Sequence, residues 1–264
     1  MSQATTTTTT TTASLKALLL FPFQGREWQG RFAVGAALVL AGLVIPILPL
    51  LFVAGYSLEI MRRAIRGEEL ALPPWADWGQ LALDGLRVSV VSLACTLPGT
   101  VVLYGGLALY LGATLGLPFV MAGDSSSGLG AIYPLFFATS VAVVLIAMLV
   151  GTLLLVLGAI PLPVATAHVA ARGRLGAAFH VREWWPLLRA NKGGYFVAWV
   201  MIAGLLSLGY LVFMLVYCTV CLCGFIPLIS APAGFYLVLV SAALFGQAYH
   251  ESVALVATSG LRDE

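Results

Sequence analysis

The residues best suited to chemistry are three cysteines near the end of an apolar stretch. Cys218, Cys221 and Cys223 form a C-x-x-C-x-C pattern, and thiolates this close together can bind a soft metal or form a disulfide. No fourth ligand lies nearby in the sequence, because His250 is expected at the opposite end of the apolar segments. Cysteine also packs well between helices as a small apolar side chain. We therefore predict structural packing here, with no metal and no cofactor.

Two other polar groups match catalytic sites only in part. Gly123–Gly128 is a serine-rich loop, but a serine nucleophile needs a base within hydrogen-bond reach, and the histidines are expected at the other face. His250, Glu251 and Gln247 could form a proton-accepting group, which capping of a helix end explains equally well. The middles of the apolar segments carry no charge, so we expect neither an ion-coupled pump nor an enzyme.

Long uncharged stretches point to a polytopic membrane protein. Hydrophobic residues make up 61% of the chain and charged residues 9%, whereas soluble domains carry about 25% charge. No charged side chain lies between Lys192 and Glu251, and similar stretches cover Val88–Gly123 and Ser125–Ala171. About 20 apolar residues cross a bilayer core as a helix. The fold class is therefore all-α, and the net charge of +2 gives no sign of a nucleic-acid partner.

The first apolar segment, Phe32–Leu58, leaves two topologies open. It is either one span or a hairpin that turns near Pro46–Pro49. Basic residues precede and follow it, and positive residues in short loops favour the cytoplasmic side, so we favour the hairpin. The bundle then has about six segments in three hairpins, with both termini and all 13 Lys and Arg residues on the cytoplasmic side. A single first span leaves five.

The chain divides into two tails and one membrane domain. Residues 1–20 form a Thr-rich tail that we expect to be disordered. Residues 21–258 form a single integral membrane domain, and residues 259–264 form a C-terminal tail. The later spans are expected at Gly85–Leu117, Ala131–Ala171, Tyr195–Tyr217 and Ala233–Glu251.

Two short amphipathic helices are predicted at the cytoplasmic surface. In the first, Trp75 and Trp78 lie on one helical face and Asp77 and Asp84 on another, with Pro73-Pro74 at the start. Tryptophan prefers the headgroup level, so this helix is expected to lie flat on the membrane. Three arginines lie just upstream and could pair with the acids: Arg62, Arg63 and Arg66.

The second predicted amphipathic helix follows residue 180. Val181, Trp184, Trp185 and Leu188 recur at spacings of three and four residues. Pro186 is expected to break or kink this helix. Its basic residues would face headgroups or solvent: Arg182, Arg189 and Lys192. Such a surface either binds anionic lipid or a partner protein, or is an ordinary loop anchored by Trp and Arg.

The most specific motif is LPPWADWGQLALDG, at Leu72–Gly85. With Phe21–Phe23, Arg66-Gly67, Asn191–Tyr195 and Gly246–Tyr249, it resembles the bacterial and archaeal membrane family numbered 4013 among domains of unknown function. That family usually has an acidic residue after the first proline of the motif, where this chain has Pro74. The resemblance implies an all-helical membrane protein without an established activity.

Two classes of function remain in view. The first is a non-catalytic scaffold, assembly factor or accessory subunit in the cytoplasmic membrane, whose partners are the lipid bilayer, including anionic lipids, and a membrane protein. The alternative is a permease or channel for a small solute, lined by helices broken at prolines. The prolines concerned are Pro46, Pro49, Pro161, Pro163, Pro227 and Pro232.

Overall fold

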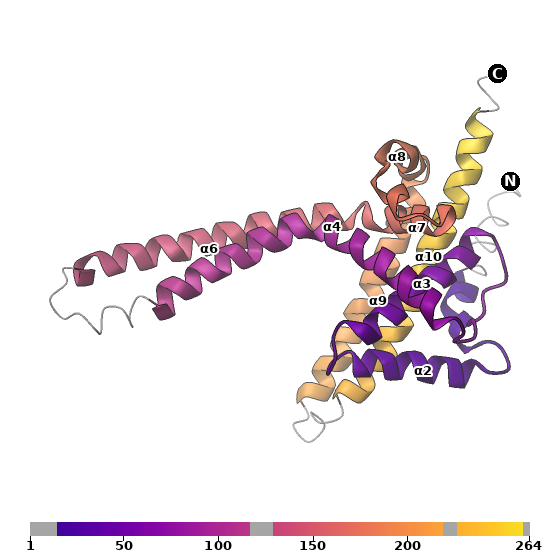
Figure 1. Ribbon diagram of the computed structural model, residues 1–264, viewed down its shortest axis with the longest axis horizontal. Helices are drawn as coiled ribbons and strands as arrows, with labels where there is room; N and C mark the ends of the chain where they lie inside the picture. The colour runs from indigo at the N-terminus through magenta and orange to yellow at the C-terminus, as the bar shows by residue number, and fades with distance from the viewer. Residues whose placement is uncertain (1–14, 117–128, 219–225, 261–264) are drawn as a thin grey trace, which may run out of the picture. The chain divides into compact units, whose positions relative to one another are not determined.

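The computed structural model describes residues 15–116, 129–218 and 226–260, and every regular element in these ranges is helical (Figure 1). The all-helical fold class is therefore confirmed. After a helical stretch at residues 15–20, the elements are η1 (Phe21–Phe23), α2 (Trp28–Ala41), α3 (Leu48–Ile65), α4 (Trp78–Leu111), η2 (Gly112–Gly116), α6 (Leu129–Ala159), α7 (Leu162–Arg172), η3 (Leu175–Phe179), α8 (Val181–Ala190), α9 (Lys192–Cys218) and α10 (Ile226–Gly260).

Four helices in the described residues are long and apolar enough to cross a membrane. They cover Trp78–Gly116, Tyr133–Arg172, Lys192–Cys218 and Ile226–Thr258. The uncharged stretches of the sequence predicted these four. The six-segment arrangement in three hairpins stays a prediction, since α2 and α3 are not among them.

The first apolar segment is interrupted where its prolines predicted. A turn at residues 42–47 separates α2 from α3, and Pro49 lies in the first turn of α3, where its missing N–H leaves no helical bond unmade. With 14 residues, α2 is about 21 Å long, shorter than the bilayer core of about 30 Å. Figure 1 shows α2 lying across α10 rather than alongside it.

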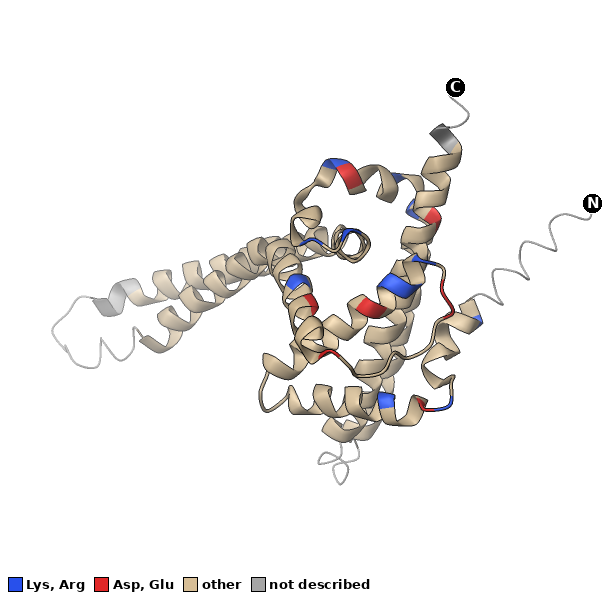
Figure 2. Ribbon diagram, turned by 45° about the vertical axis from the view of Figure 1, so that its right-hand side comes forward, with Lys and Arg blue, Asp and Glu red and all other residues tan. Residues whose placement is uncertain are grey.

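The described chain forms two compact units, and the first comprises Met1–Val90 and Pro163–Glu264. Its centre is α10, which contacts α2, α3, α8 and α9. Phe235, Leu239 and Val240 of α10 are fully buried, so this helix supplies much of the core. Figure 2 shows charged residues on several elements of this unit.

Within the first unit, α3 and the start of α4 cross at backbone contact distance. A Cβ atom on Gly55 would overlap with the carbonyl oxygen of Leu81, and a Cβ atom on Gly85 would overlap with that of Leu51. Only glycine fits at these two positions, because the atom that a larger residue would meet is backbone and has little freedom to move. The crossing fixes where α4 begins relative to α3.

The second unit, Val91–Leu162, contains the later part of α4 together with η2 and α6. Its described residues include no Asp, Glu, Lys or Arg. The two long helices approach closely, since a Cβ atom on Gly158 would overlap with the carbonyl oxygen of Cys95. Small residues allow such packing in lipid. Large apolar side chains such as Leu145 and Leu149 are exposed, as expected of a surface that contacts hydrocarbon.

Several predictions fall partly or wholly outside the described residues. Cys221, Cys223 and the loop Gly123–Gly128 lie outside them, as does most of each predicted tail. The N-terminal tail boundary at residue 20 is wrong, because residues 15–20 are helical and Leu18 is buried. The Leu19 carbonyl accepts a hydrogen bond from the Tyr236 hydroxyl at 3.2 Å, which ties this stretch to α10.

Candidate functional site

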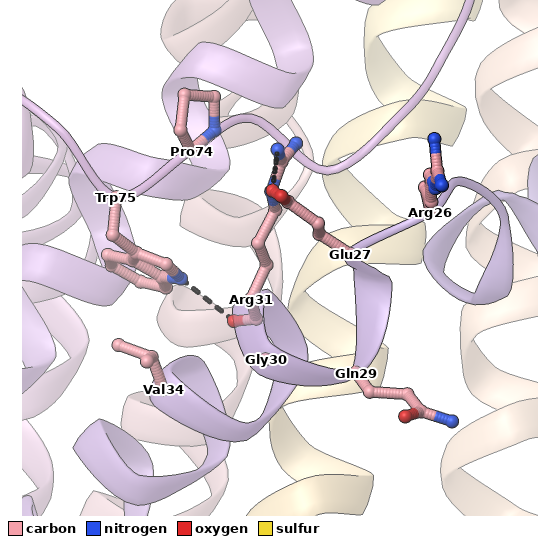
Figure 3. A pocket seen from close by; sticks show the side chains of 8 residues that line it. All are labelled: Arg26, Glu27, Gln29, Gly30, Arg31, Val34, Pro74 and Trp75. Carbon is pink, nitrogen blue, oxygen red and sulfur yellow. Dashed lines mark hydrogen bonds and ion pairs between the residues drawn. The ribbon is translucent and has the colours of Figure 1, made fainter.

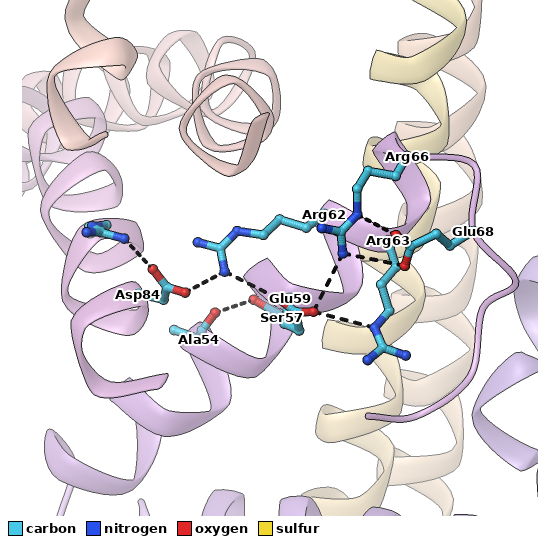
Figure 4. A network of polar contacts seen from close by, with 9 residues as sticks. Ala54, Ser57, Glu59, Arg62, Arg63, Arg66, Glu68 and Asp84 are labelled. Atoms are coloured by element: carbon cyan, nitrogen blue, oxygen red, sulfur yellow. Dashed lines mark hydrogen bonds and ion pairs between the residues drawn. The ribbon is translucent and has the colours of Figure 1, made fainter. Parts of the chain in front are cut away.

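A buried carboxylate lies where α3 and α4 cross. The Asp84 side chain is 2% exposed and accepts hydrogen bonds from Nη1 of Arg62 and from Nη1 of Arg87, each at 2.6 Å. Figure 4 shows Arg62 extending from α3 toward Asp84 on α4. A buried carboxylate is stable only when it is paired and hydrogen-bonded, and the two guanidinium groups meet that need. The predicted pairing of the upstream arginines with the acids is confirmed for Arg62 and Asp84.

Glu59 extends this network along α3. Its carboxylate lies 3.3 Å from Arg62, 3.5 Å from Arg63 and 3.9 Å from Arg66, and Arg66 also pairs with Glu68 at 2.6 Å. Burial opposes the charge on Arg62, but hydrogen bonds and charges from Asp84 and Glu59 raise the pKa of its guanidinium above the usual value. Arg62 therefore keeps its charge, and its contact with Asp84 connects the two helices.

Trp75 is half-buried and is held against neighbouring elements by ring contacts and a hydrogen bond. Its ring stacks on Tyr56 with centroids 4.1 Å apart, and it also stacks on Trp78 with centroids 5.6 Å apart. Its indole Nε1–H donates to the carbonyl oxygen of Arg31 at 2.8 Å, and the Tyr56 hydroxyl donates to the carbonyl oxygen of Pro73 at 2.8 Å. These contacts fasten the chain before α4 onto α2 and α3.

The predicted amphipathic helix is absent around Trp75 and is found only from Trp78 onward, as the start of α4. Residues 68–77 form no helix, and α4 begins only at Trp78, directly after Asp77 with a positive φ of 51°. Proline disfavours helical geometry in the residue before it, and Pro73-Pro74 acts on this segment twice. The carbonyl oxygens of Leu72 and Pro73 accept hydrogen bonds from the side chains of Arg31 and Tyr56, and not from N–H groups of a helical turn.

A helix, α8, is present where the second amphipathic helix was predicted, and it continues through Pro186 rather than breaking there. Its position at the membrane surface stays a prediction. Trp184 is 5% exposed and donates its Nε1–H to the carbonyl oxygen of Ala178 at 2.9 Å. Trp185 is 41% exposed, and the Arg189 guanidinium lies 5.2 Å from the centre of its ring. The two neighbouring tryptophans thus differ in role, since the first holds α8 in place and the second faces outward.

His168 links α8 to α7 and α10. Its ring is buried, with Nδ1 2.8 Å from the Tyr249 hydroxyl and Nε2 3.1 Å from the Glu183 carboxylate. Arg172 lies 3.5 Å from the same carboxylate. The hydrogen bond with His168, helped by the charge of Arg172, lowers the pKa of Glu183. An ionised Glu183 only accepts, so Nε2 of His168 donates to it.

The end of α3 and the junction between α8 and α9 both contact α10, at His250 and Ala248. His250 donates from Nδ1 to the carbonyl oxygen of Ile65 at 2.6 Å, just where α3 ends. Asn191, between α8 and α9, donates to the carbonyl oxygen of Ala248 at 3.1 Å. His250, Glu251 and Gln247 do not form one proton-accepting group. His250 bonds to the α3 backbone, whereas Glu251 accepts a hydrogen bond from Gln247 at 3.2 Å.

The site residues predicted from the sequence thus fall into three sets. The arginines at the end of α3 and Asp84 form one ionic network, and Trp75 and Trp78 belong to an aromatic stack. The third set lies on α8 and comprises Trp184, Trp185 and Arg189. Asp77 and Arg182 form no ion pair with any residue that the structure describes. In the described ranges, no three His, Cys, Asp or Glu residues are placed to hold a metal ion.

Sequence reasoning missed four of the residues that organise these sets: Tyr56, Glu59, Arg87 and His168. Arg87 follows Asp84 by three residues, and such pairs are neighbours on one helix face, so its pairing was predictable. The partners of Tyr56 and His168 lie on other elements. No local pattern indicates such contacts.

The comparisons with known proteins give one match. The model of a family described as protein of unknown function (DUF4013) matches residues 38–218. This stretch runs from α2 to the end of α9 and includes the Asp84 network, the aromatic stack and α8. No curated protein and no solved structure matches the chain.

Proposed function

This chain belongs to the family of proteins of unknown function DUF4013, and we propose that it is a non-catalytic scaffold or accessory subunit of the cytoplasmic membrane. In this proposal the outward side of α8 contacts a membrane protein partner. The observation that carries it is the contrast in burial between Trp184 and Trp185, because the buried Trp184 anchors the helix that presents the exposed Trp185 and Arg189.

The outward side of α8 has the composition of a binding surface. Trp185 lies beside Arg189, and the nearby apolar side chains of Phe179 and Val181 are also exposed. Tryptophan and arginine are enriched among the residues that carry most of the binding energy in protein interfaces. A rigid aromatic side chain also loses little conformational freedom when a partner covers it.

Charge favours an acidic partner. The segment from α7 to α9 carries Arg172, Arg174, Arg182, Arg189 and Lys192, and its acid Glu183 is already engaged by His168 and Arg172. Opposite charges across an interface speed association and exclude wrong partners. The same excess of arginine and lysine supports a cytoplasmic position for this loop, since positive residues of short loops stay on that side.

Site-specific photo-crosslinking in cells tests the proposal. A benzophenone amino acid at position 185 is expected to form an adduct with a protein of one discrete mass, and Arg182→Gln with Arg189→Gln is expected to reduce that adduct. The matched control is position 149, which is 74% exposed on the uncharged second unit. The same adducts at both positions, adducts with lipid alone, or no effect of the arginine variants would contradict the proposal. Solute flux through the purified protein in liposomes would instead favour a permease.

A further inference from the structure

A groove of about 570 Å³ lies between the start of α2 and the chain before α4. Figure 3 shows Arg31 and Glu27 in the middle of the lining, with Trp75 and Arg26 toward opposite sides. A smaller hollow of about 250 Å³ shares Arg26, Glu27 and Arg31 with it. All of these residues belong to the first compact unit.

The groove carries a net positive charge. Arg31 forms an ion pair with Glu27 at 2.8 Å and also donates to the carbonyl oxygen of Leu72. Its side chain is therefore fixed, and Glu27 neutralises most of its charge. Arg26 is exposed and forms no ion pair with any residue in the described part of the chain. Two guanidinium groups and one carboxylate leave one positive charge. An anion with a single negative charge would balance it.

The other side of the groove is apolar and rigid. Trp75 is fixed by its stack on Tyr56 and by its hydrogen bond to the Arg31 carbonyl. Val34 follows Arg31 by nearly one helical turn and is 39% exposed. Guanidinium groups at one side and an aromatic and aliphatic wall at the other fit a molecule with a charged head and an apolar body.

The groove also adjoins a candidate membrane span. The ring of Trp75, which lines the groove, lies 6.2 Å from that of Phe235 of α10, and Phe23, which is outside the lining, stacks on Tyr236 with ring centroids 5.7 Å apart. Both residues of α10 belong to the span Ile226–Thr258. The apolar part of a ligand in the groove would therefore lie close to this candidate span. A soluble anion would use only the charged side.

We propose that this groove binds the headgroup of an anionic glycerophospholipid that carries one negative charge. The phosphate lies at Arg26 and Arg31, where planar guanidinium groups donate to its oxygens, and the glycerol and acyl chains lie along Trp75 and Val34. The site is separate from the surface of α8, so it does not depend on the proposed role in partner binding.

The test compares lipid binding by matched arginine variants of the full chain in detergent. Arg26→Gln is expected to weaken binding of phosphatidylglycerol about tenfold, as for the loss of one hydrogen bond to a charged group, and Arg26→Lys to weaken it less. Arg182→Gln removes another arginine without an ion pair among the described residues and is expected to leave the affinity unchanged. Native mass spectrometry or a thermal shift titration measures the binding.

Three results would overturn the proposal. The first is equal affinity of Arg26→Gln and the unmodified protein for phosphatidylglycerol. The second is an equal loss of affinity for phosphatidylglycerol in Arg182→Gln, because it would show that the lipid is attracted to the positive charge of the protein in general. The third is stabilisation by inorganic phosphate or glycerol phosphate as large as that by phosphatidylglycerol, with phosphatidylcholine as the neutral reference, because it would show a site for free anions.

Discussion

Gly55 of α3 lies directly against the backbone of Leu81 on α4, so that a side chain at position 55 would overlap with the Leu81 carbonyl oxygen. Gly85 makes the reciprocal approach to Leu51. Asp84 and Gly85 are adjacent, so this contact between two backbones also brings the Asp84 carboxylate to Arg62. The ionic network thus depends on the packing of two glycines.

Gly55→Ala is expected to destabilise the protein by about 1–3 kcal/mol, the usual range for an extra group forced into a packed region. The better helix propensity of alanine, about 1 kcal/mol, offsets only part of this. Gly79→Ala is the matched control, because nothing lies within 4 Å of a Cβ atom there. Unfolding in detergent measures both variants, and equal stability of the two would contradict the close crossing.

Arg62→Gln is expected to cost up to about 3 kcal/mol, because it leaves the buried Asp84 with only one cation. Arg87 still pairs with Asp84 at 2.6 Å, which keeps the loss at the low end of the range for broken buried pairs. Arg63→Gln is the control, since its contact with Glu59 is 3.5 Å long and partly exposed, and exposed pairs contribute about 0–1 kcal/mol. A double-mutant cycle with Asp84→Asn measures the coupling, and a coupling near zero would contradict the network.

The sequence predicted the helical class, the break near Pro46–Pro49, the helix at α8 and the attraction between Arg62 and Asp84. Each of these follows from local hydrophobicity, proline geometry or charge. It did not predict the non-helical segment around Trp75, because the spacing of tryptophans there fits a helix equally well. The segment is held by hydrogen bonds that Tyr56 and Arg31, both distant in sequence, donate to the carbonyl oxygens of Pro73 and Leu72.

Trp184→Ala and Trp185→Ala are expected to differ sharply although the residues are neighbours. Trp184 is buried and hydrogen-bonded to Ala178, so its truncation is expected to cost about 3–5 kcal/mol. Trp185 is largely exposed, and its loss is expected to change stability by about 0.5 kcal/mol or less. Thermal unfolding of the two purified variants measures this difference. Equal effects would show that α8 is not held through Trp184.

The contact of Glu183 with His168 predicts a loss of stability in acid. The hydrogen bond with His168, and then the charge of Arg172, hold the pKa of Glu183 below its ordinary value of 4.5. Folding therefore favours the ionised carboxylate, and its contribution is complete above pH 4.5 and is lost as the pH falls through the lower pKa of the folded state.

Glu183→Gln removes this titration, so its stability is expected to fall less steeply with pH below 4.5 than that of the unmodified protein. Thermal unfolding midpoints at a series of pH values measure the two slopes. Parallel curves for the two proteins would contradict a role of this contact in holding α8.

The most direct test of the account is the side of the membrane on which the two loops near the end of α10 lie. Single cysteines at Glu69 and Arg174, in a background without the native cysteines, are exposed to a membrane-impermeant thiol reagent in intact and in permeabilised cells. The account predicts that both positions react only after permeabilisation, because Glu69 follows the end of α3, which bonds to His250 of α10, and Arg174 belongs to the basic segment from α7 to α9, whose Asn191 bonds to Ala248 of α10. Labelling of either position in intact cells would contradict it.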